Sequence, residues 1–327
     1  MRLNRLVKFS LVLTLLVIML GAYTRLSDAG LGCPDWPGCY GQLMVPSENE
    51  DITSAELAFP ERPVEADKAW LEMIHRYIAG LLGLVILALL IMSWKQDHAP
   101  KVLPLFIAII VIAQAALGML TVTMKLMPFI VMLHLVGGFT IFSLLFILYL
   151  RTKPLRIPGG DIGARKLAPL ALIALLVLII QIVLGGWTST NYAALVCTEL
   201  PLCESGWYSK LDFIQAFSID QGTHQTFEFG VLEYPARMTI HISHRIGAMI
   251  TAIVLLTLAI KLFRHAHSNM MRQAAIYLFV LLTLQISLGI SNIVLNLPLA
   301  IAVAHNAIAA LLLLNLVYLN YATWRKA

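Results

Sequence analysis

The sequence predicts an all-α polytopic membrane protein with about eight transmembrane helices, arranged as two pseudo-symmetric parallel four-helix bundles. Three observations predict this class. Of the 327 residues, 59% are hydrophobic and only 13% are charged, whereas soluble domains are nearer half apolar and a quarter charged. The apolar residues are gathered into runs long enough to cross a hydrocarbon core of about 30 Å. Motifs of the first half of the chain also recur in the second half in the same order.

Eight apolar runs are the expected spans, because each is close to the roughly 20 residues that a membrane helix needs. They are residues 9–24, 77–94, 103–123, 129–150, 167–187, 246–263, 274–295 and 299–320. The first run follows basic residues, as in a signal peptide. It lacks a small-residue cleavage site, so it is interpreted as a retained helix.

The distribution of charge predicts the orientation in the membrane. With eight spans, the ends and loops alternate sides, and Lys and Arg dominate the side whose only acids are Asp97 and Asp161. The positive-inside rule makes that side cytoplasmic. Both termini are therefore expected inside, and the long loops 27–70 and 190–240 outside. The net charge of +5 follows this topology and does not indicate nucleic acid as a partner. The absence of a recognisable transit peptide favours a bacterial inner membrane, with lipid around the spans.

An internal repeat fixes the predicted domains. The matched residues are Leu20-Gly21 with Leu184-Gly185, Cys33 and Cys39 with Cys197 and Cys203, His75-Arg76 with His244-Arg245, Gln114 with Gln285, Gly118 with Gly289, and His134 with His305. Their offsets stay between 164 and 171 residues. Each half has an even number of helices, so the halves are predicted to be parallel repeats. The predicted domains are an N-terminal half, 1–155, a cytoplasmic linker, 156–166, and a C-terminal half, 167–327.

Four of the nine histidines, His75, His134, His244 and His305, lie in or beside the spans. At about 1.5 Å per residue, their depths agree within roughly 5 Å, toward the outer face. Two imidazoles from facing helices of a four-helix bundle can ligate a haem iron from both sides. The alternative is an ordinary interhelical hydrogen bond, which the in-register duplication disfavours. Copper or zinc is disfavoured because no carboxylate or thiol repeats at ligand spacing.

The two halves differ beside the second-helix histidine. Residues 72–76 read Glu-Met-Ile-His-Arg, and residues 241–245 read His-Ile-Ser-His-Arg. Because positions three apart share a helix face, Glu72 is expected to point toward the same pocket as His75. A carboxylate there can move protons or stabilise a developing cation, which makes Glu72 the candidate catalytic residue. The alternative is a helix-start acid paired with Arg76.

Arg76 and Arg245 follow the two second-helix histidines directly. Arginine makes bidentate bonds to carboxylates, so both are candidates for contacts with haem propionates. They are equally explained as residues that extend their charge to the membrane interface.

All four cysteines fall in the outer loops, where disulfides persist. Cys33 and Cys39 are six residues apart, as are Cys197 and Cys203. This spacing matches neither a Cys-x-x-Cys redox motif nor a zinc knuckle. It favours two disulfides, Cys33–Cys39 and Cys197–Cys203, that each close a loop, with thiol exchange as the alternative.

These motifs resemble a known family. The run Gly30–Pro37 (Gly-Leu-Gly-Cys-Pro-Asp-Trp-Pro) after the first helix is similar to the outer-loop signature of haem A synthases. The Glu-x-x-His-Arg motif of residues 72–76 looks like that family's second-helix motif. The resemblance covers essentially the whole chain, although the second loop, at residues 196–201, keeps only its cysteines.

The resemblance implies an oxidoreductase that converts a ring methyl of haem O, its substrate, to a formyl group through hydroxylated intermediates. It implies a permanent haem b on His244 and His305, and a substrate haem on His75 and His134. It also implies, as partners, the farnesyltransferase that makes haem O and the assembly of cytochrome oxidase. The electron acceptor is unknown, and a homo-oligomer is left open.

Two other functions use the same histidines. A di-haem b-type carrier would pass electrons between quinol and a partner, with Glu72 incidental. A haem transporter or chaperone would use the sites as transit points. The presence of Glu72 in the first half alone favours the enzyme.

Overall fold

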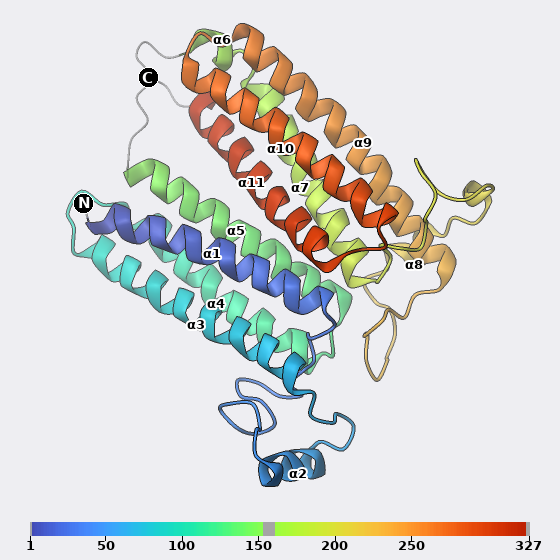
Figure 1. Ribbon diagram of the computed structural model, residues 1–327. Coiled ribbons are helices and arrows are strands. Elements are labelled where there is room, and N and C mark those ends of the chain that lie inside the picture. The colour runs from blue at the N-terminus through green and yellow to red at the C-terminus, as the bar shows by residue number, and fades with distance from the viewer. Residues whose placement is uncertain (1, 153–160, 325–327) are drawn as a thin grey trace. The chain divides into compact units, whose positions relative to one another are not determined.

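The computed structural model describes residues 2–152 and 161–324, and its ordered elements are all helical (Figure 1). The elements are α1 (Arg2–Leu26), α2 (Asn49–Ala58), α3 (Ala66–Trp94), α4 (Val102–Thr123), α5 (Pro128–Thr152), α6 (Ile162–Arg165), α7 (Ala168–Thr190), η1 (Trp207–Ser209), α8 (Phe213–Ala216), α9 (Tyr234–His265), α10 (Asn269–Val294) and α11 (Leu299–Trp324). Residues 156–160 of the predicted linker lie outside the described residues, and its remainder contains α6.

The prediction of an eight-span helical membrane protein is confirmed. Among the described residues, eight helices are long and apolar enough to cross a membrane: α1, α3, α4, α5, α7, α9, α10 and α11. Two of them begin well before the predicted runs, since α3 starts at Ala66 and α9 at Tyr234. Their first turns are too polar to be recognised by hydropathy. The symmetry relating the two halves stays a prediction.

The chain divides into two compact units, one of Met1–Ile141 with Ile219–Val231 and the other of Phe142–Ser218 with Leu232–Ala327. In the first unit, α3 packs against α1 and α4. α5 adjoins both α4 and α1, because Gly137 lies against the side chain of Gln114 and Gly138 faces Ile18. The first unit is thus a bundle whose helices carry His75 and His134.

The second unit is a closed ring of helices. α7 packs against α9 and α11, and α10 packs against the same two helices. Leucines fill the middle of this ring, and Leu255, Leu258, Leu278 and Leu316 are almost completely buried. The apolar packing of this ring holds α9 and α11 together, and these are the helices that carry His244 and His305.

One segment of the second outer loop, Ile219–Val231, belongs to the first unit. The Phe227 amide donates to the carbonyl of Lys125, in the turn between α4 and α5, at 3.0 Å. Glu228 forms an ion pair with Arg62 of the first outer loop at 2.8 Å. The segment therefore binds to the end of the first unit at which α4 ends and α5 begins.

Asp161 joins two helix starts in the second unit. One carboxylate oxygen accepts from the Ala164 amide at 2.9 Å and so caps α6. The other accepts from the His267 amide at 3.0 Å, and from the Ser268 amide at 2.9 Å and hydroxyl at 2.8 Å. Burial acts to raise the pKa of Asp161, but these hydrogen bonds outweigh it and hold the pKa below its usual range.

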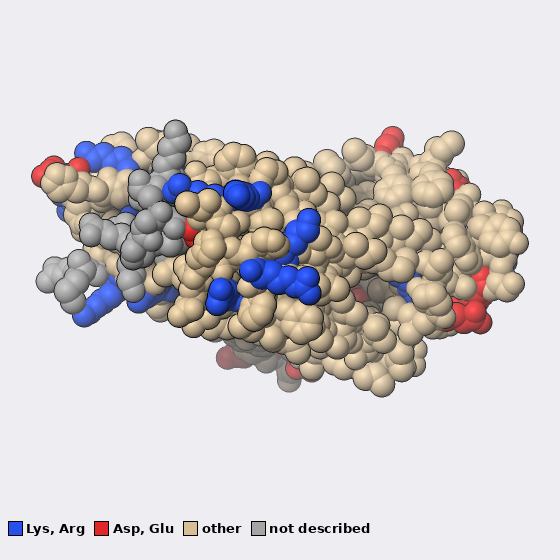
Figure 2. All heavy atoms as spheres, turned by 90° about the horizontal axis from the view of Figure 1, so that it is seen from above, with Lys and Arg blue, Asp and Glu red and all other residues tan. Residues whose placement is uncertain are grey.

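Charged side chains are unevenly distributed on the surface. On the face shown in Figure 2, Lys and Arg gather on the left and in the middle of the view, and the right-hand end carries mostly Asp and Glu. The positive-inside rule concerns the Lys and Arg side chains alone, which it places on the cytoplasmic side of a multi-pass membrane protein. The inside–outside orientation itself stays a prediction.

Candidate functional site

Each unit brings together two of the four intramembrane histidines. In the first unit, His75 of α3 and His134 of α5 lie close enough to interact electrostatically. In the second unit, His244 of α9 and His305 of α11 form the equivalent pair. The sequence predicted that helices two and four of each half supply these residues, and each unit places them together.

The four imidazoles fit a flat iron-containing ligand. Each of these side chains is half-buried, so part of its surface remains free for contact with a ligand. Each also lies deep within its helical bundle. Nδ1 of His75, of His134 and of His305 is buried without a hydrogen-bond partner among the described residues. Buried imidazole nitrogens are normally paired, and a ligand bound between the two rings of a pair would interact with such nitrogens. A paired donor set of this kind is what a haem iron takes.

Glutamine side chains engage the histidines of the second unit. The Gln181 amide nitrogen lies 2.9 Å from Nδ1 of His244 and donates to the His244 carbonyl at 3.0 Å. The Gln285 amide nitrogen lies 3.1 Å from Nε2 of His305. Such contacts fix the orientation of a ligating ring. The sequence analysis did not find these pairs, because only the fold brings Gln181 to His244.

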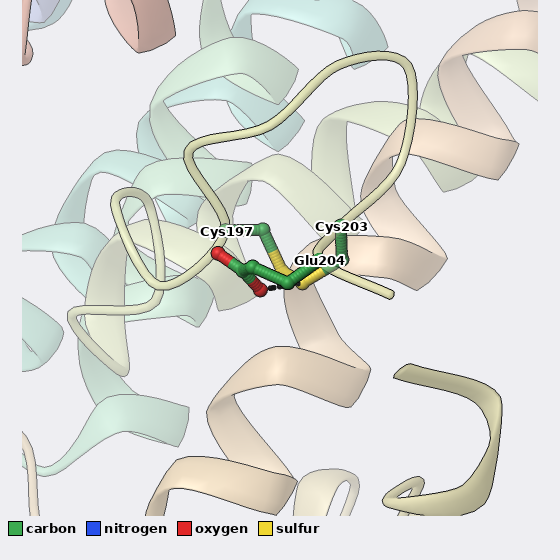
Figure 3. Close-up of side chains that lie close together, drawn as sticks. All are labelled: Cys197, Cys203 and Glu204. Carbon is green, nitrogen blue, oxygen red and sulfur yellow. Dashed lines mark hydrogen bonds between the residues drawn. A yellow bond between two sulfur atoms is a disulfide. The ribbon is translucent and has the colours of Figure 1, made fainter. Parts of the chain in front are cut away.

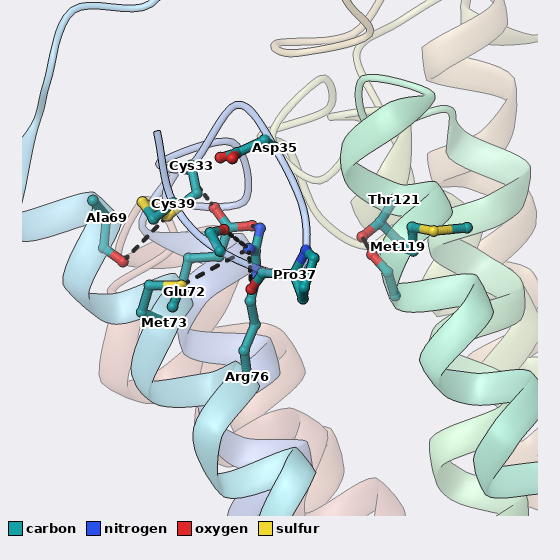
Figure 4. Close-up of polar contacts among 12 residues, drawn as sticks. Cys33, Asp35, Pro37, Cys39, Ala69, Glu72, Met73, Arg76, Met119 and Thr121 are labelled. Carbon is teal, nitrogen blue, oxygen red and sulfur yellow. Dashed lines mark hydrogen bonds and ion pairs between the residues drawn. A yellow bond between two sulfur atoms is a disulfide. The ribbon is translucent and has the colours of Figure 1, made fainter. Parts of the chain in front are cut away.

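Glu72 lies near the N-terminal end of α3, next to the first disulfide loop (Figure 4). Its side chain is buried, with a residue exposure of 5%. One carboxylate oxygen accepts from the Cys33 amide at 2.9 Å, and the other forms a 2.5 Å ion pair with Arg76. The carboxylate thus has defined partners, and the pairing with Arg76 that was considered as its alternative role is present.

Arg76 extends the same network into the loop. Its Nη1 donates to the carbonyls of Gly38 at 2.5 Å and of Pro37 at 3.3 Å. Glu72 and Arg76 together therefore fasten both ends of the Cys33–Cys39 loop to α3. A haem propionate near Arg76 would share these donors.

The loop signature has a local structural explanation. The Asp35 carboxylate accepts from the amides of Tyr40 and Gly41, each at 2.7 Å. Tyr40 and Gly41 both have positive φ, so they form the centre of a tight turn. Gly32 lies against the backbone of Lys68, where a side chain would collide. The signature residues thus shape a compact cap on the start of α3.

The second unit repeats this arrangement with different chemistry. Arg245 donates to the carbonyls of Cys197 and Glu199, each at 2.5 Å, and to Nε2 of His241 at 3.1 Å. His241 replaces Glu72 as the partner of the arginine four residues later. The arginine–loop contact is therefore common to both units, and the carboxylate belongs to the first unit only.

Both predicted disulfides are present. Cys33 is bonded to Cys39, and Cys197 to Cys203. Glu204 lies beside the second disulfide, with its carboxylate 2.9 Å from Sγ of Cys203 (Figure 3). This cluster resembles a metal site by proximity alone. Because both sulfurs are in the disulfide, neither is available as a thiolate ligand.

The fold and the paired histidines define a class: an all-helical multi-pass membrane protein with a candidate haem site in each of two units. A family model described as "Cytochrome oxidase assembly protein" matches residues 4–317. The chain belongs to this family. The resemblance predicted from the loop and second-helix motifs is thereby confirmed.

Individual relatives carry the name "Heme A synthase". The protein of Shewanella oneidensis is 59% identical over 327 residues, which cover 100% of this chain and 98% of that protein. The protein of Rickettsia prowazekii is 29% identical, covering 93% of this chain and 92% of its own length. The protein of Granulibacter bethesdensis is 27% identical, with coverages of 91% and 81%.

Proposed function

We propose that this chain is a haem A synthase, an oxidoreductase that converts a ring methyl of haem O to a formyl group. The observation that carries the proposal is the 59% identity to the Shewanella oneidensis "Heme A synthase" over the full length of the chain. Two units that each hold a histidine pair support it, since the reaction needs a haem as substrate. The difference between Glu72 and His241 supports a division of labour between the units.

The first unit is the proposed substrate site, with His75 and His134 as ligands of the haem O iron. Loss of two electrons, to an electron acceptor outside the chain, and of one proton from a methyl carbon attached to a porphyrin would place positive charge on that carbon. The Glu72 carboxylate, held in place by Cys33 and Arg76, is suited to stabilise this charge and to accept a proton from a water that adds there. A fixed charge in a dry, low-dielectric site has a much larger effect than in water.

The second unit is the proposed site of a permanent haem b, with His244 and His305 as ligands. A haem b bound there supplies electron-transfer chemistry. Gln181 and Gln285 contact the rings of these two histidines. Gln114, the repeat counterpart of Gln285, likewise forms a hydrogen bond with His134 in the first unit. Such contacts orient the ligands of a resident cofactor.

The proposed location is the bacterial inner membrane, with both termini cytoplasmic and the disulfide loops outside. The class of reaction that supplies the substrate is the farnesylation of haem b to haem O. The product would serve cytochrome oxidase, in keeping with the description of the family.

Haem chromatography tests the proposed function. The chain is expressed in a host that lacks haem A, with and without a farnesyltransferase that supplies haem O. We expect haem A or hydroxylated haem O only when haem O is supplied. A matched variant, His75→Ala with His134→Ala, should abolish conversion. Haem b alone under both conditions would favour the di-haem carrier, and bound but unchanged haem O would favour a transporter.

A further inference from the structure

A glycine of a neighbouring helix lies against each of the four paired histidines. A Cβ added at Gly21 of α1 would lie 2.9 Å from Cε1 of His75, and one added at Gly118 of α4 would lie 3.4 Å from Cε1 of His134. In the second unit, the same distances are 3.1 Å from Gly185 of α7 to His244 and 3.2 Å from Gly289 of α10 to His305.

The same ring atom makes the closest approach in every case. Cε1 is bonded to both imidazole nitrogens. A contact at Cε1 therefore affects the direction in which both nitrogens point. Carbon atoms pack best at about 3.5–4.0 Å, and the methyls added at Gly21, Gly185 and Gly289 would be clearly closer than that. Alanine at Gly21, Gly185 or Gly289 would therefore push the imidazole away from its helix, whereas at Gly118 its methyl would make an ordinary van der Waals contact with the ring.

Other helical glycines have different neighbours. Gly80, on the same helix as His75, has nothing within 4 Å of an added Cβ, and Gly83 has only Val111 at 3.9 Å. Gly137 and Gly247 face glutamine side chains. Gly163 of α6 and Gly222 of the loop before α9 also lie near a histidine ring. Among the glycines of the membrane-spanning helices compared above, contact with an imidazole is confined to the four in the first and third helices of each half.

We propose that Gly21, Gly118, Gly185 and Gly289 are positioning residues for the haem ligands. Each lets its helix close against one imidazole edge, which fixes the ring's position and plane relative to the iron. This inference rests on the proposed function, because it takes the four histidines to be haem ligands. It adds that the iron–imidazole geometry is set by the partner helix as well as by the helix that carries the histidine.

The second unit offers a test without turnover. Gly185→Ala and Gly289→Ala are compared with Gly80→Ala, which adds the same methyl to a helix in open space. Gly→Ala favours a helix in all three variants, so lost helix propensity cannot explain a difference. In purified full-length protein, we expect the first two to shift the low-spin haem b electron paramagnetic resonance signal and its midpoint potential. Retention of haem b should fall about tenfold, at the lower end of the loss seen when a ligand's outer contacts change.

The outcomes separate this inference from the proposed function. The positioning role would be overturned if Gly185→Ala and Gly289→Ala matched Gly80→Ala in three properties: the haem b spectrum, the midpoint potential and the retention of haem b. His244→Ala, measured alongside, tests the ligand assignment: full retention of haem b there would overturn the assignment itself. If Gly185→Ala does not accumulate in the membrane, Gly289→Ala decides.

Discussion

Glu72 and His241 occupy corresponding positions, and their contacts show what the difference between them changes. Both interact with the arginine one helical turn later, and in both units that arginine holds the disulfide loop. Only Glu72 also contacts the loop directly, through the Cys33 amide. The carboxylate therefore has a structural role in holding the loop. An experiment on its chemical role must separate the two effects.

Replacing Glu72 by Gln separates the two roles. We predict that this variant folds, keeps haem b and binds haem O, but makes little haem A, because the amide cannot stabilise positive charge on the substrate. It should accumulate the hydroxylated intermediate. Arg76→Gln is the matched control, since it loosens the same loop but leaves the carboxylate. His241→Ala should reduce conversion less than either.

Chromatography of haems extracted from cells gives the answer. Normal haem A from Glu72→Gln would show the carboxylate to be structural only. Equal losses in Glu72→Gln and Arg76→Gln would assign the effect to the Glu72–Arg76 pair and the loop that it holds, and not to the carboxylate alone.

The sequence predicted the candidate site residues but not their contacts. The duplicated histidines were recognised because their depth in the helices follows from residue number. Two kinds of contact could not be predicted: the hydrogen bond from the Cys33 amide to Glu72, and the glutamine–histidine contacts. They join segments that are far apart in the chain, and their alignment is known only once the helices are packed.

At the scale of elements, the disulfide loops are caps on α3 and α9. Cys33, Cys39 and Tyr40 pack with Ala69 and Met73 of α3. The second loop packs on Met238 and Ile242 of α9 through Cys197. Each cap therefore covers the polar first turns that hydropathy failed to assign to a span, which explains why both helices begin earlier than predicted.

Removing the first disulfide should loosen only the first cap. Closing a loop of this length is worth about 2–3 kcal/mol in simple chain-entropy estimates. We predict that Cys33→Ser with Cys39→Ser raises hydrogen exchange in residues 31–42 and leaves residues 196–204 unchanged. Cys197→Ser with Cys203→Ser should do the reverse. Unchanged exchange in both loops would show that the side-chain network alone holds the caps.

The hydrogen bonds that Asp161 accepts at the starts of α6 and α10 should make the free energy of unfolding depend on pH. Its pKa is lower in the folded chain than in the unfolded chain, so its contribution is complete above about pH 4 and is lost as the pH falls through the folded-state pKa. We predict that Asp161→Asn costs on the order of 2 kcal/mol at pH 7, typical of hydrogen bonds to a charged group. Thermal unfolding in detergent should show the two proteins converging below pH 4. A constant difference down to pH 3 would contradict this.

At the scale of the whole molecule, hydropathy and charge together predicted eight spans and a direction of insertion. The eight spans are present, and the direction can be measured. We predict that alkaline phosphatase is active when fused after residue 222, in the second outer loop, and inactive when fused after residue 327. The opposite pattern would invert the topology and place both disulfides in the reducing cytoplasm.

The assignment of Ile219–Val231 to the first unit was beyond sequence analysis. The repeat predicted that everything after residue 167 would belong to the C-terminal half. The contacts of Phe227 with Lys125 and of Glu228 with Arg62 instead join this segment to the first unit. The unit against which a loop packs depends on tertiary contacts, which leave no periodic pattern in the sequence. A membrane span, in contrast, is recognised directly from its apolar run.

The central claim is that the two units hold different haems: the second a permanent haem b, the first the substrate. Absorption spectra of purified His244→Ala and His75→Ala, with extraction of the bound haem, test it most directly. We predict that His244→Ala loses the resident haem b and that His75→Ala keeps it, with His305→Ala and His134→Ala behaving like their partners. Loss of the resident haem from His75→Ala, and its retention in His244→Ala, would contradict the claim and reverse the roles of the units.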